Sequence, residues 1–166
     1  MMNVQPESCA LNKKEKLMHH LAQLNIGRIK FPLDDLRMAE FVETLARINA
    51  LAERSSGFIW RLQDDSGNAT SIEAYDDPDI IINMSVWESV DALKAYVYKT
   101  DHSDFLRRRH EWFERMMPYM VMWWVPAGNI PTVAEAKEQL AYLEQNGETA
   151  RAFTFRNVFE PDELVI

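Results

Sequence analysis

The stretch IIINMSVWESVDALKAYVY, residues 80–98, decides how the chain folds. Its first half is a dense run of branched apolar side chains interrupted by Asn83 and Ser85, which predicts a strand buried on both faces. Its second half changes to helical spacing, with Leu93 and Val97 on one face of the predicted helix. A central strand that leads directly into a helix indicates a fold of mixed α and β elements.

Length and composition indicate a globular protein with one folded domain. The chain has 166 residues, of which 47% are hydrophobic, and this is enough for a substantial core. We expect the domain to span residues 19–160, with a mobile tail at residues 1–18 and a C-terminal tail at residues 161–166. The net charge of −8 argues against a broad nucleic-acid-binding surface, because such a surface is basic.

The cellular setting is also predicted from what the sequence contains. Cys9 is the only cysteine, so an intramolecular disulfide is excluded, and we assign it no chemistry. No apolar run approaches the roughly 18 residues that a membrane span needs, and the first 18 residues lack the apolar core of a secretion signal. These features predict a cytoplasmic protein with no membrane partner.

The order of the remaining elements predicts the fold class. Strands are expected at residues 20–29, 57–63, 119–125 and 151–159, with a short one around 71–75, and helices at residues 36–54, 100–116 and 133–146. This order contains the split βαββαβ unit of an α+β, ferredoxin-like fold, with extra helices and a C-terminal strand. Right-handed crossovers place the first strand beside the strand that begins at residue 80, in the centre of the sheet.

The predicted sheet is apolar on both faces, but the predicted helices suffice to cover one. A second subunit would most simply cover the other face. We therefore expect a homodimer that forms through the open sheet face, giving a dimeric α/β barrel.

Two segments carry a resemblance to a known superfamily. NMSVWESVDALKAYVY (residues 83–98) and WWVPAGNIPTVAEAK (residues 123–137) resemble the dimeric α/β-barrel proteins that include antibiotic-biosynthesis monooxygenases. The closest resemblance is to an uncharacterised bacterial family catalogued as a domain of unknown function, over residues 20–159. The superfamily includes cofactor-free oxygenases, cyclases, chlorite dismutase-like haem proteins and small-molecule binders. The resemblance therefore implies the fold and leaves the reaction open.

Uncharged polar side chains are predicted to meet at the centre of the sheet. Gln23 and Asn25 share one face of the first strand, and Asn83 and Ser85 share one face of its expected neighbour. We expect Asn83 to be remote from water. Four such groups in an apolar shell suit a neutral or weakly acidic organic ligand. The predicted ligand-binding residues are Gln23, Asn25, Asn49, Asn83, Ser85, Trp87, Tyr96 and Trp123. The alternative is that the amides satisfy one another or backbone groups at a subunit interface.

His102 and His110 are the candidate catalytic residues, because imidazole titrates near neutral pH and can act as a general base. No nucleophile or paired acid stands at a matching spacing, so the alternative is two partly exposed histidines without a catalytic role. The neighbouring run of residues 107–109, three arginines, is interpreted as a solvated helix face.

The sequence predicts no cofactor and no metal. It lacks a glycine-rich phosphate loop at a strand-to-helix turn, which argues against flavin. Haem-degrading relatives need an asparagine, for which Asn25 could serve, but Tyr96 stands near the place of their tryptophan. Neither His102 nor His110 is at the spacing of their histidine. Met84, Met116, Met117, Met120 and Met122 could suggest Cu(I) ligation, but we interpret them as core residues.

The functional prediction is a small-molecule-binding dimer, acting as a cofactor-independent monooxygenase, cyclase or isomerase on an organic metabolite. The alternative is a non-catalytic ligand-binding or structural protein.

Overall fold

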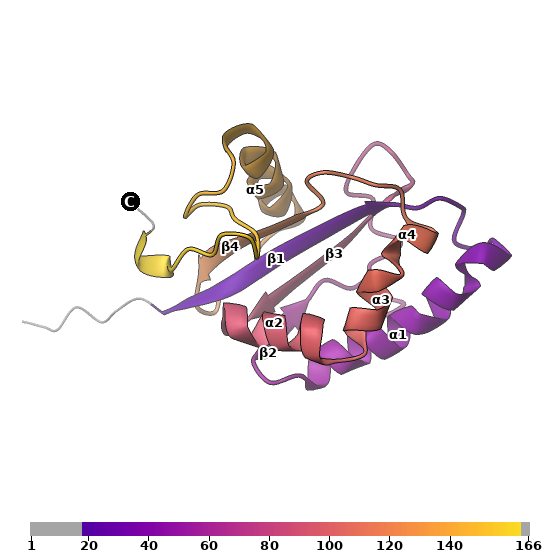
Figure 1. Ribbon diagram of the computed structural model, residues 1–166, viewed down its shortest axis with the longest axis horizontal. Coiled ribbons are helices and arrows are strands. Elements are labelled where there is room, and N and C mark those ends of the chain that lie inside the picture. The colour runs from indigo at the N-terminus through magenta and orange to yellow at the C-terminus, as the bar shows by residue number, and fades with distance from the viewer. Residues whose placement is uncertain (1–17, 164–166) are drawn as a thin grey trace, which may run out of the picture.

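Four antiparallel strands form one sheet in the order β2-β3-β1-β4, and helices pack on both of its faces (Figure 1). The strands are β1 (His19–Arg28), β2 (Phe58–Arg61), β3 (Ile80–Trp87) and β4 (Met120–Pro126). The computed structural model describes residues 18–163. Cys9, most of the expected N-terminal tail and the last three residues of the expected C-terminal tail lie outside the described residues.

The centre of the sheet confirms the prediction from strand order. β1 pairs with β3 on one side and with β4 on the other. The register places Gln23 opposite Ser85 and Asn25 opposite Asn83. Because side chains alternate between the two faces of a strand, all four polar side chains lie on the same face. This strand order and the helices between the strands give the predicted ferredoxin-like α+β fold.

Two helices cover the face of the sheet that carries the polar side chains. A 3-10 turn, η1 (Leu36–Met38), leads into α1 (Ala39–Arg54), and α2 (Val90–Lys99) follows β3 directly. The Ser89 hydroxyl accepts a hydrogen bond from the Ala92 amide at 3.1 Å, which satisfies a free N–H in the first turn of α2. Ile48 and Leu93 are buried in the same apolar cluster, which joins these helices to the sheet.

The opposite face of the sheet is covered by α5 (Val133–Asn146) and by the segment between β2 and β3. Ala136, Leu140 and Leu143 of α5 are buried against strand residues such as Leu24 and Met84. The expectation of an open face is therefore wrong, because a single chain already buries these strand residues. The reason to expect a homodimer through this face is that a second subunit has to cover it, and that reason no longer applies. The dimeric barrel stays a prediction.

The helix expected over residues 100–116 is two short helices instead. α3 (His102–Arg107) and α4 (Arg109–Trp112) meet at Arg108, whose backbone angles, φ −88° and ψ 1°, interrupt the helix. Phe113 then takes an extended conformation and forms a single β-bridge with Ile29. This break brings the end of α4 against β1.

Two expected strands are absent from the described chain. Residues 71–75 form no strand, because Asp64 organises the segment: its carboxylate accepts hydrogen bonds from the backbone and hydroxyl groups of Ser66 and Ser71. Residues 151–159 form only isolated bridges, one of them between Phe153 and Met122 of the edge strand β4. The chain turns within 149–157, so the ladder does not continue. A last 3-10 turn, η2 (Pro161–Glu163), follows.

No helix in residues 18–163 has the length and apolar character that crossing a membrane requires.

Candidate functional site

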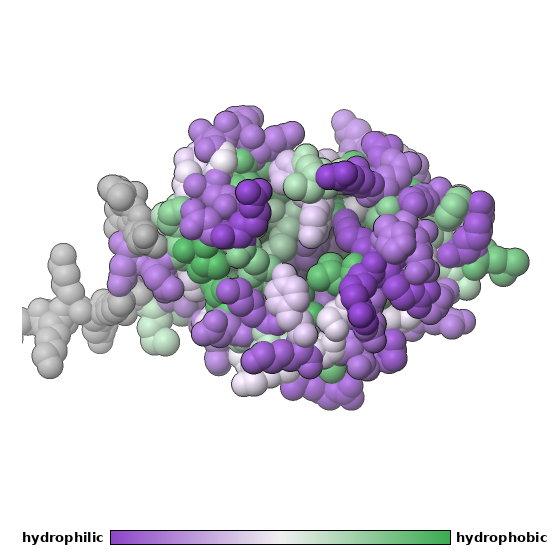
Figure 2. Space-filling model, viewed as in Figure 1, coloured by the Kyte–Doolittle hydropathy of each residue, from purple (hydrophilic) through white to green (hydrophobic). Residues whose placement is uncertain are grey.

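A cavity of about 710 Å³ lies over the polar face of the sheet centre. Its wall takes residues from β1, β3, all of the helices α1 to α4 and the loop at residues 68–70. Figure 2 shows a hollow near the middle of the face viewed, with hydrophobic side chains inside it and hydrophilic side chains around it. This size and mixed lining are typical of a site for a small organic molecule.

Gln23 is the centre of the polar group at the base of this cavity. Its amide nitrogen donates to Asn83 Oδ1 at 3.0 Å and to Ser85 Oγ at 2.8 Å, and its carbonyl oxygen accepts from Asn25 Nδ2 at 2.8 Å. The Trp87 indole N–H also donates to Ser85 Oγ, at 2.8 Å. The hydrogen-bonding capacity of the Gln23 amide is therefore largely used by protein, and its side chain is fixed in one orientation.

Asn25 and Asn83 keep unused hydrogen-bonding groups. Among the described residues, Asn25 Oδ1 has no donor and Asn83 Nδ2 has no acceptor, while both side chains line the cavity. Asn83 is exposed, so the expectation that it is remote from water is wrong. The reason is that the helices do not close over the middle of β3, and the cavity reaches it. The polar cluster therefore has two parts. Gln23 is buried and hydrogen-bonded within the protein, whereas the unused groups of Asn25 and Asn83 can bind a ligand in the cavity.

Aromatic rings form much of the cavity wall. Phe41 on α1 packs against Phe105 on α3, with 5.6 Å between ring centroids, and edge-on against Phe113, at 5.2 Å. Tyr96 on α2 stacks on Trp87 at 5.1 Å and donates from its hydroxyl to the Ile48 carbonyl oxygen at 3.2 Å. Burial raises the pKa of Tyr96 well above its usual value, so this hydroxyl stays protonated.

His102 lies between two of these rings, with centroid distances of 4.8 Å to Tyr96 and 6.1 Å to Phe105. Its Nδ1 is buried and has no hydrogen-bond partner among the described residues. Burial lowers the pKa of His102 to about 4, which the Val97 backbone opposes in part. The imidazole is therefore neutral at pH 7, at the edge of the cavity.

Arg109 is a cavity residue that the sequence interpretation missed. The interpretation of residues 107–109 as a solvated face is wrong for this arginine, which is half-buried and lines the cavity. Its guanidinium lies 4.6 Å from the Phe113 ring centroid and 4.7 Å from that of Tyr119. No helical period could have identified it, because the helix breaks at Arg108 and this break decides where Arg109 points.

Six of the ten predicted site residues line the cavity: Gln23, Asn25, Asn49, Asn83, Tyr96 and His102. The side-chain N–H of Asn49 donates to Asn68 Oδ1 at 2.8 Å, which ties α1 to the loop at the cavity wall. No sequence pattern marked Asn68, because its loop is placed by tertiary contacts.

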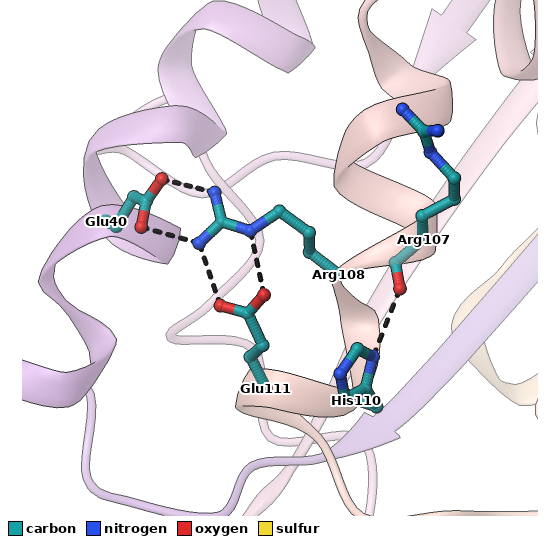
Figure 3. Close-up of polar contacts among 5 residues, drawn as sticks. All are labelled: Glu40, Arg107, Arg108, His110 and Glu111. Carbon is teal, nitrogen blue, oxygen red and sulfur yellow. Dashed lines mark hydrogen bonds and ion pairs between the residues drawn. The ribbon is translucent and has the colours of Figure 1, made fainter.

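The other four predicted residues lie elsewhere. Ser85 accepts a hydrogen bond from Gln23, and Trp87 donates one to Ser85, so these two residues support Gln23 without lining the cavity. Trp123 is on the opposite face of the sheet, where its indole N–H donates to Glu135 Oε1 at 3.0 Å. His110 is exposed on α4, with Nδ1 3.1 Å from the Arg107 carbonyl oxygen, and does not line the cavity (Figure 3).

No group of three or more His, Cys, Asp or Glu side chains in the described part of the chain is arranged to hold a metal ion.

Comparison with solved structures gives distant likeness. SnoaB, a cofactor-independent oxygenase from Streptomyces nogalater, is 16% identical, with a TM-score of 0.44 over 68% of this chain and 98% of that chain. A protein of unknown function from Nitrosomonas europaea is 14% identical, with a TM-score of 0.44 over 70% and 98% of the two chains. A monooxygenase from the gene ActVA-Orf6 of Streptomyces coelicolor, solved with the ligand nanaomycin D, is 15% identical, with a TM-score of 0.40 over 69% and 94%.

A search of curated proteins found no match. The profile of one protein family, described as Domain of unknown function (DUF3291), matches residues 20–165, nearly the whole chain. The chain therefore belongs to the DUF3291 family.

Proposed function

We propose that the chain binds a small, mainly apolar organic molecule in this cavity, with a polar group of the molecule against Asn25 and Asn83. The observation that carries the proposal is that each of these amides makes one hydrogen bond to Gln23 and keeps one group for the cavity. Asn25 keeps its carbonyl oxygen, and Asn83 keeps its NH₂ group. Such a pair supplies one donor and one acceptor, which suits a carbonyl or hydroxyl group. The aromatic wall would bury the rest of the molecule.

A fluorescence titration with N-phenyl-1-naphthylamine, a neutral probe that brightens in apolar surroundings, tests this proposal. The wild-type chain should bind it saturably, at one molecule per chain. Asn83→Phe should abolish the binding, because Asn83 is exposed in the cavity and a larger ring there fills open space. Glu43→Phe is the matched control, since Glu43 is exposed on α1 outside the cavity. Binding that survives Asn83→Phe would contradict the proposal.

A second candidate is catalysis without a cofactor, as an oxygenase, cyclase or isomerase. It is favoured by His102, the one histidine among the described residues that lines the cavity, because a neutral imidazole can accept a proton. A base with so low a pKa suits a C–H or O–H group that a neighbouring carbonyl already acidifies. The resulting enolate or phenolate is the form from which isomerisation, cyclisation or reaction with O₂ would start.

Solvent deuterium exchange into the acidic C–H positions of 2-tetralone, followed by NMR, tests this second candidate. The wild-type chain should accelerate the exchange, and His102→Gln should reduce the acceleration by about 10²-fold or more, the usual contribution of a general base. His110→Gln tests the second histidine, and a loss there in place of His102 would reverse the assignment. Binding without any acceleration would leave the chain a non-catalytic binder.

A homodimer is a further part of the proposal, and it would have to use a surface other than the sheet face that α5 covers. Light scattering at micromolar concentration should report twice the mass of one chain. A monodisperse monomer would remove the dimer from the proposal and leave the cavity unaffected.

A further inference from the structure

The three consecutive arginines of residues 107–109 have different surroundings. Arg107 is exposed and pairs with Asp104. Arg108 points the other way along the surface, where both Glu40 and Glu111 bind its guanidinium (Figure 3). Arg109 has no carboxylate partner among the side chains that the structure describes, residues 18–162, although it is the most enclosed of the three cations.

The protein uses little of the hydrogen-bonding capacity of Arg109. Its Nη2 donates to the Ile26 carbonyl oxygen at 2.6 Å, and the guanidinium lies between the rings of Phe113 and Tyr119. A guanidinium has five N–H donors, so most of them remain. Burial lowers the pKa of Arg109 from its usual value, but arginine stays charged at any physiological pH. A half-buried positive charge without a counter-ion is costly to a folded protein.

The position of this charge relates it to the amide cluster. Gln23, Asn25 and Gly27 lie on one face of β1, and consecutive members of this row are about 7 Å apart. A Cβ atom on Gly27 would lie only 2.6 Å from Phe113 Cδ1 and 3.0 Å from Arg109 Nη2. Because Gly27 has no side chain, the Arg109 guanidinium can occupy the space beside it, at the position that follows Asn25 on this face of β1. Along β1, the lining of the cavity therefore changes from the neutral amides of Gln23 and Asn25 to the positive charge of Arg109, which reaches the strand from α4.

We infer that the ligand of this cavity is an aromatic organic acid, whose carboxylate or other anionic oxygen binds Arg109 while its rings pack on Phe41, Phe105 and Phe113. The inference rests on the proposed function and narrows it to one substrate class. Arg109 binds the ligand directly through charge-assisted hydrogen bonds. The amides of Asn25 and Asn83 then receive a neutral polar group elsewhere on the same molecule.

A pair of fluorescent probes with the same rings separates charge from shape. 8-Anilinonaphthalene-1-sulfonate carries one negative charge, and N-phenyl-1-naphthylamine is its neutral counterpart. Arg109→Met keeps a long apolar stem and removes the charge. It should weaken binding of the sulfonate by about 10-fold to 100-fold, the range for a hydrogen bond to a charged group, and change binding of the neutral probe by less than about two-fold. Arg109→Lys, which keeps a point charge, should recover part of the loss.

Arg107→Met is the matched control, because it removes the same net charge from an exposed neighbour in the same chain. It should leave both titrations unchanged. Near-ultraviolet circular dichroism checks that each variant keeps its tertiary packing, and Arg109→Lys carries the test if Arg109→Met does not fold. Equal losses for the two probes in the Arg109 variants, or no loss for the sulfonate, would overturn the inference while the proposed function stands. Failure of both probes to bind the wild-type chain would instead overturn the proposed function.

Discussion

The side-chain amide of Gln23 donates a hydrogen bond to Asn83 Oδ1 at 3.0 Å, across the two central strands of the sheet. The two residues are 60 positions apart in the sequence, and only one of them is buried: Gln23 is 3% exposed, while Asn83 faces the cavity. The hydrogen bond therefore joins a structural residue, Gln23, to a residue that is accessible to a ligand, Asn83.

Substitution of these two residues should distinguish the structural role of Gln23 from the ligand-binding role of Asn83. Gln23→Leu leaves Asn25 and Ser85 without their buried partner and should lower the free energy of unfolding by about 1–3 kcal/mol. Asn83→Leu should change it by less than about 1 kcal/mol, because cavity water can take its place, and should weaken probe binding. Urea denaturation of both variants measures this. Equal destabilisation by the two substitutions would show that Asn83 is a structural residue.

Gly27→Ala should disturb the place where α4 meets β1. The added methyl group would overlap the Phe113 ring, which is 5% exposed and has little room to move, so a loss of about 1–3 kcal/mol in the free energy of unfolding is expected. Phe113→Leu should relieve part of this overlap. A double-mutant cycle on residues 27 and 113 should therefore give a coupling energy well above 0.5 kcal/mol. Strict additivity would argue against the close contact.

Acidification should destabilise the protein through His102. Burial lowers its folded-state pKa to about 4, below the usual value of 6.5, so the unfolded chain binds more protons between these pH values. The stabilisation is complete above pH 6.5 and is lost as the pH falls towards 4, by up to about 3 kcal/mol. His102→Gln should flatten this part of the stability profile, measured by denaturation at several pH values. His110→Gln, an exposed histidine on α4, is the control. An unchanged slope in His102→Gln would contradict the burial of this imidazole.

Leu140→Ala tests whether α5 covers the second face of the sheet. Leu140 is 6% exposed against the strands, and its truncation should cost about 2–5 kcal/mol at any protein concentration. Glu138→Ala, on the exposed side of α5, should have little effect. A small effect of Leu140→Ala, together with a melting temperature that rises with protein concentration, would indicate that a second subunit covers the face instead.

The sequence by itself determined the elements whose information is local. The apolar period of residues 80–98 specified both β3 and α2, and the side chains of Ser89 and Thr132 cap α2 and α5 as their positions in the sequence require. The order of elements placed β1 beside β3, and alternation along these strands then brought Gln23 and Asn83 together. Period-two alternation fixes which face a side chain takes once the neighbouring strand is known.

Tertiary structure alone decided where the chain turns and what lines the cavity. Residues 151–159 alternate like a strand, yet they meet β4 in the described chain through a single bridge at Phe153, because the chain reverses before a ladder forms. The break at Arg108 turned Arg109 towards β1, and Gly27 left it room. Each of these outcomes depends on contacts between residues that are distant in the sequence. Local propensity and period carry no information on such contacts, since they describe an element before it has neighbours.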